Sequence, residues 1–264
     1  MFTFILERGM AIMMLKIILS GCNGQMGRTI TRCAAVRDDC RIVAGIDLDS
    51  AMNGGYPVFT DPVLCTVEAD VIIDFSHPSA LSPLLKMATG SQTPVVISTT
   101  GIGESQVMDI KTAARSVPIF FSANMSLGVN LLRELSRIAA KALGGSFDIE
   151  IVEKHHNQKV DAPSGTALML ADAISEVLPQ APKYVYDRRS HRGKRTKNEI
   201  GLHAIRGGTI TGEHDVIFAG RDEVITLSHS AYSKDVFAVG SLKAALFLAG
   251  KPPGLYGMAD LLRD

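Results

Sequence analysis

The chain has 264 residues, 46% of them hydrophobic, with 27 Lys+Arg against 27 Asp+Glu. This length fits one large domain or two modest ones, and the charge balance gives no overall field that would attract nucleic acid or an anionic membrane. The four cysteines contain no Cys-x-x-Cys pair; this argues against a disulfide framework and a zinc site and favours a reducing, cytoplasmic location.

The first fourteen residues are rich in methionine, but Glu7 and Arg8 interrupt their apolar stretch. The stretch is too short and too charged to span a bilayer, and it lacks the basic start and the cleavage site of a secretory signal. We expect an extension or an upstream start codon here, with the fold beginning near Met14.

The first half of the chain alternates short apolar runs with helical patterns, which predicts βαβ units in a parallel sheet covered on both faces. Strands are predicted at 15–19, 41–46, 71–75, 95–98 and 119–121, and helices at 26–37, 80–89 and 104–116.

The pattern changes after Asn124. The predicted elements there are an amphipathic helix at 127–143, with Leu131, Leu135, Ile138 and Ala142 on one face, a strand at 147–153, a helix at 163–178, a hairpin of 215–218 with 223–228, and a helix at 236–249 that returns to the first domain. We therefore expect an α/β chain: a Rossmann-type parallel-sheet domain at 1–126, completed by 234–264, and a smaller α+β domain at 127–233 with a mixed or antiparallel sheet.

A glycine-rich turn follows the first predicted strand and opens the first predicted helix. Gly21, Gly24 and Gly27 are spaced G-x-x-G-x-x-G, and glycines at such a turn let a pyrophosphate approach the free N–H groups of the helix N-terminus. Asp47 ends the second predicted strand, where an acidic residue bonds the ribose hydroxyls of a dinucleotide. A turn without a ligand is the alternative; we favour dinucleotide binding.

The same region predicts which nicotinamide dinucleotide is preferred. Asp47 and Asp49 place two carboxylates near the ribose edge, and the turn offers Gln25 instead of Arg. A 2′-phosphate would be repelled there, so we expect NADH to be preferred over NADPH, with Arg28 as the nearest cation that could compensate.

The segment 150–166 combines groups that suit a small, negatively charged substrate. His155 and His156 can exchange protons near neutral pH. Lys159 and the amides of the Ser164-Gly165-Thr166 turn can hold anionic oxygens. A surface pair of histidines is the alternative. A metal site is not expected, because adjacent histidines rarely share one ion.

Taken together, these residues resemble the dihydrodipicolinate reductase family, from about Lys16 to the C-terminus. The segment 153–167, Glu-Lys-His-His-Asn-Gln-Lys-Val-Asp-Ala-Pro-Ser-Gly-Thr-Ala, matches the family signature, and supporting matches lie at 21–28, 98–101, 122–130 and 212–214. Ser98 stands where the family often has Gly.

The resemblance implies an NADH- or NADPH-dependent reduction of the cyclic dicarboxylate 4-hydroxy-tetrahydrodipicolinate in lysine and diaminopimelate biosynthesis. It implies His155 as catalytic acid/base, Lys159 as proton donor, and His156, Gly165 and Thr166 as substrate-binding residues in the second domain. The implied cofactor-binding residues are Gly21, Cys22, Asn23, Gly24, Gln25, Met26, Asp47, Ser98, Thr99, Thr100, Ser122, Ala123, Asn124 and Met125. The family is commonly tetrameric through the second domain's sheet, so a homotetramer is expected.

Other features have alternative interpretations. His77 follows the end of a predicted strand and either contacts the cofactor or caps a turn, whereas His191, His203, His214 and His229 are interpreted as polar surface or strand positions. The basic run 188–197 is interpreted as a solvated loop, with a flap toward the dicarboxylate or a neighbouring subunit as the alternative. Two further functions stay open: another Rossmann oxidoreductase, for example one acting on a sugar, and a non-catalytic dinucleotide-sensing protein.

Overall fold

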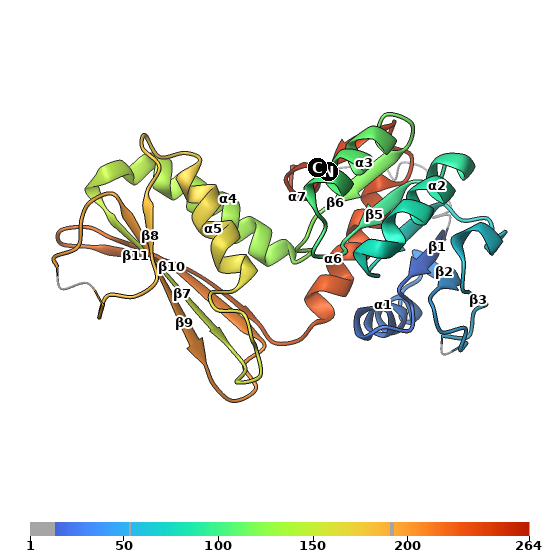
Figure 1. Ribbon diagram of the computed structural model, residues 1–264, viewed down its shortest axis with the longest axis horizontal. Coiled ribbons are helices and arrows are strands. Elements are labelled where there is room, and N and C mark those ends of the chain that lie inside the picture. Colours follow the sequence, from blue (N-terminus) through green and yellow to red (C-terminus); the bar gives the residue numbers. More distant parts are fainter. Residues whose placement is uncertain (1–13, 53, 191–192, 264) are drawn as a thin grey trace, which may run out of the picture. The chain divides into compact units, whose positions relative to one another are not determined.

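The computed structural model describes residues 14–52, 54–190 and 193–263 (Figure 1). The N-terminal extension expected before Met14 and the residue His191 lie outside the described residues. Two compact units are present: one comprises residues up to Ala123 together with Ser241–Gly257, and the other comprises Asn124–Gly240 and the residues from Met258 onward. The chain therefore changes unit three residues before the expected boundary at 126 and seven residues after the expected one at 233.

The N-terminal unit is built on a parallel sheet of seven strands. Their order is β12(Gly254–Tyr256), β6(Pro118–Phe121), β5(Val95–Ile97), β4(Val71–Asp74), β1(Leu15–Ser20), β2(Cys40–Ile46) and β3(Val58–Phe59). The order 3-2-1-4-5-6 is that of dinucleotide-binding sheets, which bind their ligand where the order reverses, between β1 and β4. The predicted strands are confirmed; β3 and β12, with two and three residues, are too short to show a pattern.

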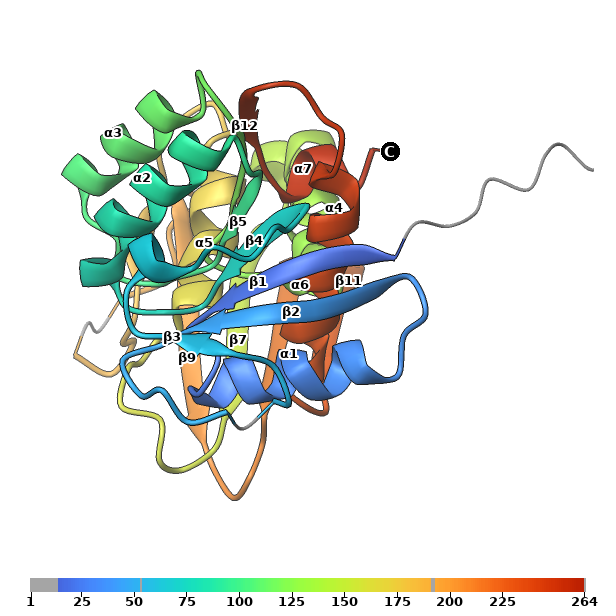
Figure 2. The ribbon, with the colours of Figure 1, turned by 90° about the vertical axis from the view of Figure 1, so that its right-hand side faces the viewer.

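Helices cover both faces of this sheet (Figure 2). They are α1(Gln25–Ala35), α2(Leu81–Ser91), α3(Glu104–Ala113) and the second half of α6(Asp235–Leu248). Leu84 of α2 and Ile110 of α3 are fully buried in one core with Ile72 of β4. On α6, Phe247 meets Phe120 of β6 edge to face at 6.1 Å between ring centroids. The predicted return of the last long helix to the first domain is therefore observed for its second half.

The C-terminal unit has a mixed sheet of five strands. Their order is β11(Val224–Ala231), β10(Gly212–Ala219), β7(Asp148–His155), β9(Glu199–Arg206) and β8(Lys183–Val185). The predicted hairpin is confirmed as the antiparallel pair β10–β11, whereas β7, β9 and β8 run parallel. The helices α4(Leu127–Leu143) and α5(Gly165–Ser175) pack on one face. The short helix α7(Met258–Leu261) packs on α4. The residues from Met258 onward therefore belong to this unit, although they were expected to complete the first domain.

The apolar face predicted for α4 is not the face that it buries. Leu131, Leu135 and Ile138 are 50%, 43% and 65% exposed. The buried residues include Val129, Leu132, Ser136 and Ala140. Small residues let α4 approach its neighbours closely, and the Ser136 hydroxyl is satisfied by donating to the Leu132 carbonyl at 2.7 Å. The helix bounds were predicted correctly, but its orientation was wrong.

Two polar residues of β7, Glu153 and His155, lie on the helix-covered face of the sheet. Ile149, Ile151, Glu153 and His155 alternate with outward-facing residues along the strand, so they share one face. Glu153 lies opposite His214 of β10, and His155 lies opposite Arg206 of β9. The apolar row of the core thus ends in a polar cluster. Along the described parts of the chain, no helix is both long and apolar enough to cross a membrane.

Candidate active site

The glycine-rich turn has the strand–turn–helix context that the sequence predicts. β1 ends at Ser20 and α1 begins at Gln25. Gly21 has φ +77°, and a Cβ there would lie 2.5 Å from the Phe75 carbonyl oxygen; a Cβ on Gly27 would lie 2.2 Å from the Gly21 carbonyl oxygen. Only glycine fits at these two positions. Gly24 is the N-cap residue and has no side chain to occupy the place where an anion would meet the helix N-terminus.

Asp47 holds this turn from the end of the neighbouring strand. Its carboxylate accepts a hydrogen bond from the backbone N–H of Asn23 at 2.9 Å. The Asn23 amide donates in turn to the Asp49 carbonyl at 2.7 Å. Arg28 donates to the Asn23 carbonyl at 2.9 Å, so its guanidinium also belongs to the turn. The predicted acidic residue therefore lies beside the predicted glycine turn.

A cavity of about 660 Å³ opens beside the turn, where β1, β2 and β4 end. Its lining includes Ser20, Gly21, Asn23, Gly24, Asp47, Leu48, Asp49, Asp61, Phe75, Ser76, His77 and Pro83. Cys22 is buried beneath it, and burial together with the nearby Asp47 charge raises the pKa of this thiol to about 11. The thiol therefore stays neutral, as part of the packing under the turn.

The end of β4 supplies a polar residue that the sequence analysis missed. Asp74 is fully buried, and its carboxylate accepts 2.6 Å hydrogen bonds from the hydroxyls of Thr99 and Ser76. Thr99 in turn accepts from the Ser76 backbone N–H at 3.1 Å. Of the predicted stretch 98–100, Ser98 and Thr99 are buried and Thr100 is exposed. The Asp at the end of a buried apolar run was the available signal for this anchor.

Of the two roles predicted for His77, the structure shows the turn cap, and the residue also lies where a cofactor contact could be made. Its Nδ1 accepts from the Ser79 backbone N–H at 3.2 Å, which caps the short 3₁₀ helix Pro78–Ala80. The same residue lines the cavity. A cofactor contact by the ring stays a prediction.

In the C-terminal unit, a buried carboxylate organises the histidine segment. Glu153 is fully buried, and its Oε2 lies 2.6 Å from Nδ1 of His155. Arg206 donates to both carboxylate oxygens at 2.7 Å, and the Ser164 backbone N–H donates to Oε1 at 3.0 Å. His155 is the last residue of β7 and is 9% exposed. The strand end, the neighbouring strand β9 and the start of α5 therefore meet at one carboxylate.

Opposing effects act on the pKa of Glu153. Burial would raise it, but the hydrogen bonds from Arg206, His155 and the Ser164 backbone outweigh burial and hold the pKa below its ordinary value. The carboxylate is therefore ionised at neutral pH, and the Nδ1 that faces it must carry a proton.

His214 belongs to this cluster: the expected strand position is confirmed, since it lies in β10, but it is buried and not at the surface. It is 4% exposed, its Nε2 lies 2.9 Å from the Ser164 hydroxyl, and its ring meets that of His155 edge to face at 5.3 Å between centroids. Burial, with the charge of His155, lowers the pKa of His214 to about 4. Ser164 also caps α5 by accepting from the Ala167 N–H at 3.1 Å. The neutral imidazole of His214 thus holds Ser164, the N-cap residue of α5, in place.

The remaining predicted substrate residues lie at the start of α5 or in the segment between β7 and α5. Gly165 and Thr166 are its first two residues, and Lys159 forms an ion pair with Asp161 at 2.7 Å. His156 lies just after β7 and is half-buried. Asn124, assigned to the cofactor by resemblance, donates to the Thr166 hydroxyl at 3.1 Å. It therefore lies in the same unit as the predicted substrate residues.

The other predicted cofactor residues near Asn124 divide between the units. Ser122 and Ala123 belong to the N-terminal unit, whereas Met125 belongs to the C-terminal one. Met125 is buried, and a Cβ added to Gly240 would lie 1.7 Å from its carbonyl oxygen. The Met125 backbone therefore packs tightly on α6.

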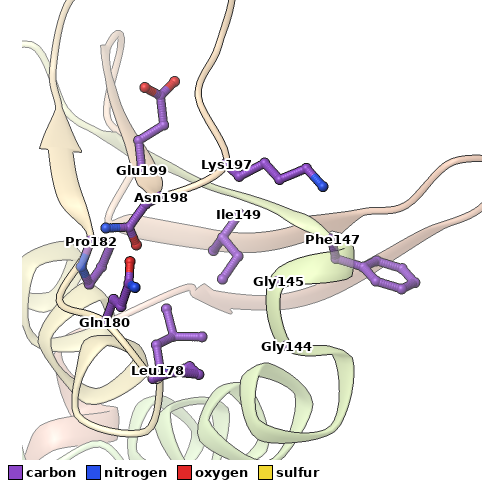
Figure 3. A pocket seen from close by; sticks show the side chains of 11 residues that line it. Gly144, Gly145, Phe147, Ile149, Leu178, Gln180, Pro182, Lys197, Asn198 and Glu199 are labelled. Carbon is purple, nitrogen blue, oxygen red and sulfur yellow. The ribbon is translucent and has the colours of Figure 1, made fainter.

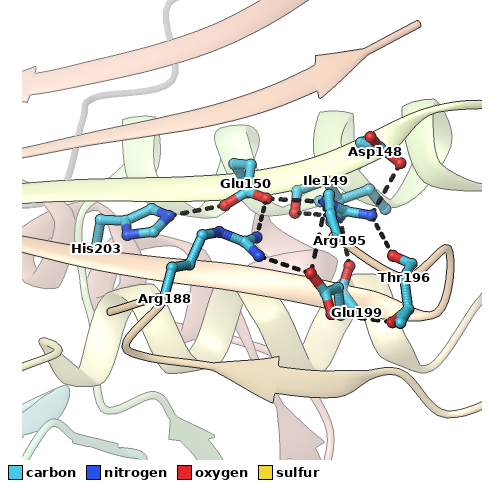
Figure 4. Close-up of polar contacts among 8 residues, drawn as sticks. All are labelled: Asp148, Ile149, Glu150, Arg188, Arg195, Thr196, Glu199 and His203. Atoms are coloured by element: carbon cyan, nitrogen blue, oxygen red, sulfur yellow. Dashed lines mark hydrogen bonds and ion pairs between the residues drawn. The ribbon is translucent and has the colours of Figure 1, made fainter. Parts of the chain in front are cut away.

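Two arginines of the basic run are anchored, which the solvated-loop interpretation did not anticipate (Figure 4). Arg188 forms ion pairs with Glu150 at 2.5 Å and Glu199 at 2.7 Å, and Arg195 forms one with Asp148 at 2.8 Å. Burial would raise the pKa of Glu150, but hydrogen bonds from His203 and Arg195 hold it below its ordinary value. The run links β8 to its parallel neighbour β9, and these pairs fix its two ends to the sheet.

A smaller hollow of about 230 Å³ lies at the opposite end of β7 (Figure 3). Phe147, Ile149 and Leu178 line it together with residues before β9. At about 3.3 Å per residue, Ile149 lies ~20 Å along the strand from His155. This hollow is therefore separate from the histidine cluster. Across the described residues, no group of three His, Cys, Asp or Glu side chains could hold a metal ion.

Comparisons with known proteins agree with this geometry over nearly the whole chain. The family model for dihydrodipicolinate reductase, N-terminus, matches residues 15–125, and that for dihydrodipicolinate reductase, C-terminus, matches residues 128–262. The chain belongs to the dihydrodipicolinate reductase family. Members of this family use NADH or NADPH as the reductant.

Curated family members are similar over their full length. A 4-hydroxy-tetrahydrodipicolinate reductase of Caldanaerobacter subterraneus subsp. tengcongensis is 54% identical over 95% of this chain and 99% of its own. One from Clostridium tetani is 51% identical over 96% of this chain and 98% of its own.

Solved structures show the same fold. Dipicolinate-bound dihydrodipicolinate reductase from Paenisporosarcina sp. TG-14 matches with a TM-score of 0.78 and 24% identity, over 94% of this chain and 99% of the other. A myo-inositol dehydrogenase from Corynebacterium glutamicum matches with a TM-score of 0.58 and 15% identity, over 91% of this chain and 90% of the other. The two-unit fold therefore extends to oxidoreductases with other substrates, so the fold alone does not identify the reaction.

Proposed function

We propose that this chain reduces 4-hydroxy-tetrahydrodipicolinate to tetrahydrodipicolinate with a reduced nicotinamide dinucleotide, in lysine and diaminopimelate biosynthesis. The observation that carries the proposal is the shared carboxylate of Glu153, which joins the imidazole of His155 to the N-terminus of α5 through Ser164. A proton donor and an anion-binding helix end thus lie within a few ångströms, in a chain that the family matches along almost its whole length.

The N-terminal unit fits a dinucleotide. The glycine turn has no room for a Cβ at Gly21 or Gly27, the N-cap residue Gly24 of α1 lines the cavity, and Asp47 lies at the ribose position. Bound there, the dinucleotide supplies the hydride. Gly21 and Gly24, which carry no side chain, would let its phosphates approach the N-terminus of α1, and the other residues assigned by resemblance would orient its nicotinamide half.

The C-terminal unit fits a small dicarboxylate. The N–H groups of Gly165 and Thr166 are in the first turn of α5, where the helix dipole favours an anion and where Ser164 caps only the third N–H. Lys159 and His156 add cationic or hydrogen-bonding groups close by. Dipicolinate, the ligand of the Paenisporosarcina protein, has the ring and the two carboxylates that such a site requires.

His155 would supply the proton. Hydride addition leaves electron density on the substrate ring, and the imidazole can release a proton from Nε2 while Nδ1 stays hydrogen-bonded to Glu153. Lys159 would release Asp161 to neutralise a substrate carboxylate and to assist the transfer. General acid catalysis of this kind contributes about 10²–10⁴ in rate, and the remainder comes from holding the reacting groups in contact.

NADH is the proposed preferred reductant. Asp47 and Asp49 both line the cavity, and Arg28 uses its Nε–H to donate to the Asn23 carbonyl. A 2′-phosphate placed there would meet two carboxylates. A strong NADPH preference in kcat/KM would contradict this charge argument.

A homotetramer through the sheet of the C-terminal unit is also proposed. The sheet face opposite α4 and α5 carries the apolar residues Val152 and Ile205, the latter 47% exposed, beside charged groups. Val152 lies on the central strand, so Val152→Glu should dissociate the assembly in analytical ultracentrifugation. A monomeric wild type at micromolar concentration would contradict this assembly.

The decisive test of the function is the loss of nicotinamide absorbance on mixing purified protein, NADH and the dicarboxylate, repeated with NADPH. Wild type should turn over, and His155→Ala should lower kcat by ~10²-fold or more while leaving NADH affinity within a factor of two. A dinucleotide-sensing protein would bind NADH without turnover. An oxidoreductase that acts on a sugar or polyol would instead reduce NAD⁺ with that substrate.

A further inference from the structure

The buried carboxylate of Glu153 has every one of its hydrogen-bonding positions filled. Oε2 accepts from His155 Nδ1 at 2.6 Å and from Arg206 at 2.7 Å; Oε1 accepts from the second nitrogen of Arg206 at 2.7 Å and from the Ser164 N–H at 3.0 Å. A carboxylate that is fully buried and bound on all sides cannot rotate or exchange with water. It is therefore a rigid support for the imidazole.

The surroundings of His155 leave its other ring nitrogen as the reactive one. His155 Nε2 faces Gly212 of β10, where an added Cβ would lie 3.1 Å away, so the glycine keeps that side of the ring open. The edge-to-face contact with His214 fixes the plane of the ring. Nδ1 is committed to Glu153, which leaves Nε2 as the atom that can exchange a proton.

We propose that Glu153 and Arg206 are positioning residues that hold the proton of His155 on Nδ1 and set its acidity through opposing charges. This inference rests on the proposed function, because it assigns how that site orients its acid. Glu153 places a negative charge beside the imidazolium and favours it. Arg206 donates to the same carboxylate oxygen, Oε2, as His155 does. Its positive charge offsets that of the carboxylate and so disfavours the imidazolium form of His155.

The two charges make opposite predictions for the pH profile. Activity that needs the imidazolium falls as pH rises. Glu153→Gln keeps the size of the side chain but removes its charge and two of its four acceptor positions, so this falling limb of kcat should move to lower pH by about one unit. Arg206→Gln removes the opposing charge, so the limb should move to higher pH. Near pH 8, kcat of Glu153→Gln should fall by about 10-fold, while the KM for NADH stays within a factor of two.

Three further titratable groups belong to or lie next to this cluster, and both variants leave them unchanged. They are His214 of β10, whose ring contacts that of His155, and Lys159 and Asp161 of the loop after β7, which pair with each other. A purely structural role for the pair would lower the amount of folded enzyme without moving the limb. Shifts in opposite directions are therefore specific to the electrostatic assignment. Limbs that stay in place, or that move in the same direction, would overturn it.

A measurement on the wild-type protein tests the proposal even if one of these variants fails to fold. Nitrogen NMR of the histidine rings, with the His155 signals identified by their loss in His155→Gln, reports which nitrogen carries the proton in the neutral form. The proposal expects it on Nδ1. A proton on Nε2 would overturn it. This reading needs no substrate, so it is distinct from a failure of the proposed function, which would appear as no NADH oxidation by the wild type.

Discussion

Replacing Gly27 by alanine tests the cofactor site at its most crowded point. A Cβ there would lie 2.2 Å from the Gly21 carbonyl oxygen and 2.5 Å from that of Cys22, and both are backbone atoms that cannot rotate away. Helix α1 must then move off the turn by about 1 Å. Overpacking costs ~1–3 kcal/mol, and the rigid neighbours place Gly27→Ala in the upper part of this range, at about 2–3 kcal/mol.

The assays are thermal unfolding and calorimetric NADH binding. We expect the melting temperature of Gly27→Ala to fall by ~4–12 °C and NADH affinity to weaken by at least ~10-fold, or ~1.4 kcal/mol. Gly90→Ala is the matched control: Gly90 is in α2 with nothing within 4 Å of an added Cβ, so alanine should stabilise by ~0.5–1 kcal/mol. If Gly27→Ala binds NADH as well as this control does, the reasoning about the turn is wrong.

Three further changes test other parts of the molecule. Asp47→Asn keeps an oxygen for the Asn23 N–H but removes a charge, so the kcat/KM ratio of NADH to NADPH should fall by ~10-fold; an unchanged ratio would reject Asp47 as the discriminating charge. The folded pKa of His214, about 4, lies below the unfolded value of about 6.5, so the unfolded state binds more protons between them and stability should fall by up to about 3 kcal/mol as pH drops through this window. Urea unfolding of His214→Gln should lose this slope, and equal slopes would contradict the burial argument. Arg195→Met leaves the carboxylates of Glu150 and Asp148 with fewer partners and should lower stability by ~2 kcal/mol, with NADH affinity, measured as a control, unchanged.

The N-terminal unit could be predicted from sequence because its signals are local. A buried strand is a short apolar run, and the turn that follows β1 must contain Gly21 and Gly27 for steric reasons that any such fold shares. The carboxylate of Asp47 then follows from its place at the end of the next strand. Asp74 was missed because its partners, Ser76 and Thr99, come together only through the register of β4 and β5.

The C-terminal unit was harder because its strands pair across long separations. β9 contains Gly201 and His203, which obscure its alternation, and it pairs with β7 from about fifty residues away. Arg206 and His214 could be assigned to the site only once this register was known. The buried face of α4 was predicted wrongly for a related reason. Ser136 and Asn130 can be buried because their side chains donate hydrogen bonds to backbone carbonyls one turn earlier, which a count of apolar residues cannot show.

The most direct measurement of the central claim compares two substrates under one set of conditions. Purified wild-type protein is mixed with NADH and the dicarboxylate, and separately with NAD⁺ and myo-inositol, and nicotinamide absorbance is followed. We expect rapid NADH oxidation in the first mixture, slowed by ~10²-fold or more in His155→Ala, and no reaction in the second. Turnover of myo-inositol with an inert dicarboxylate, or NADH oxidation that survives His155→Ala at near-normal kcat, would contradict the account.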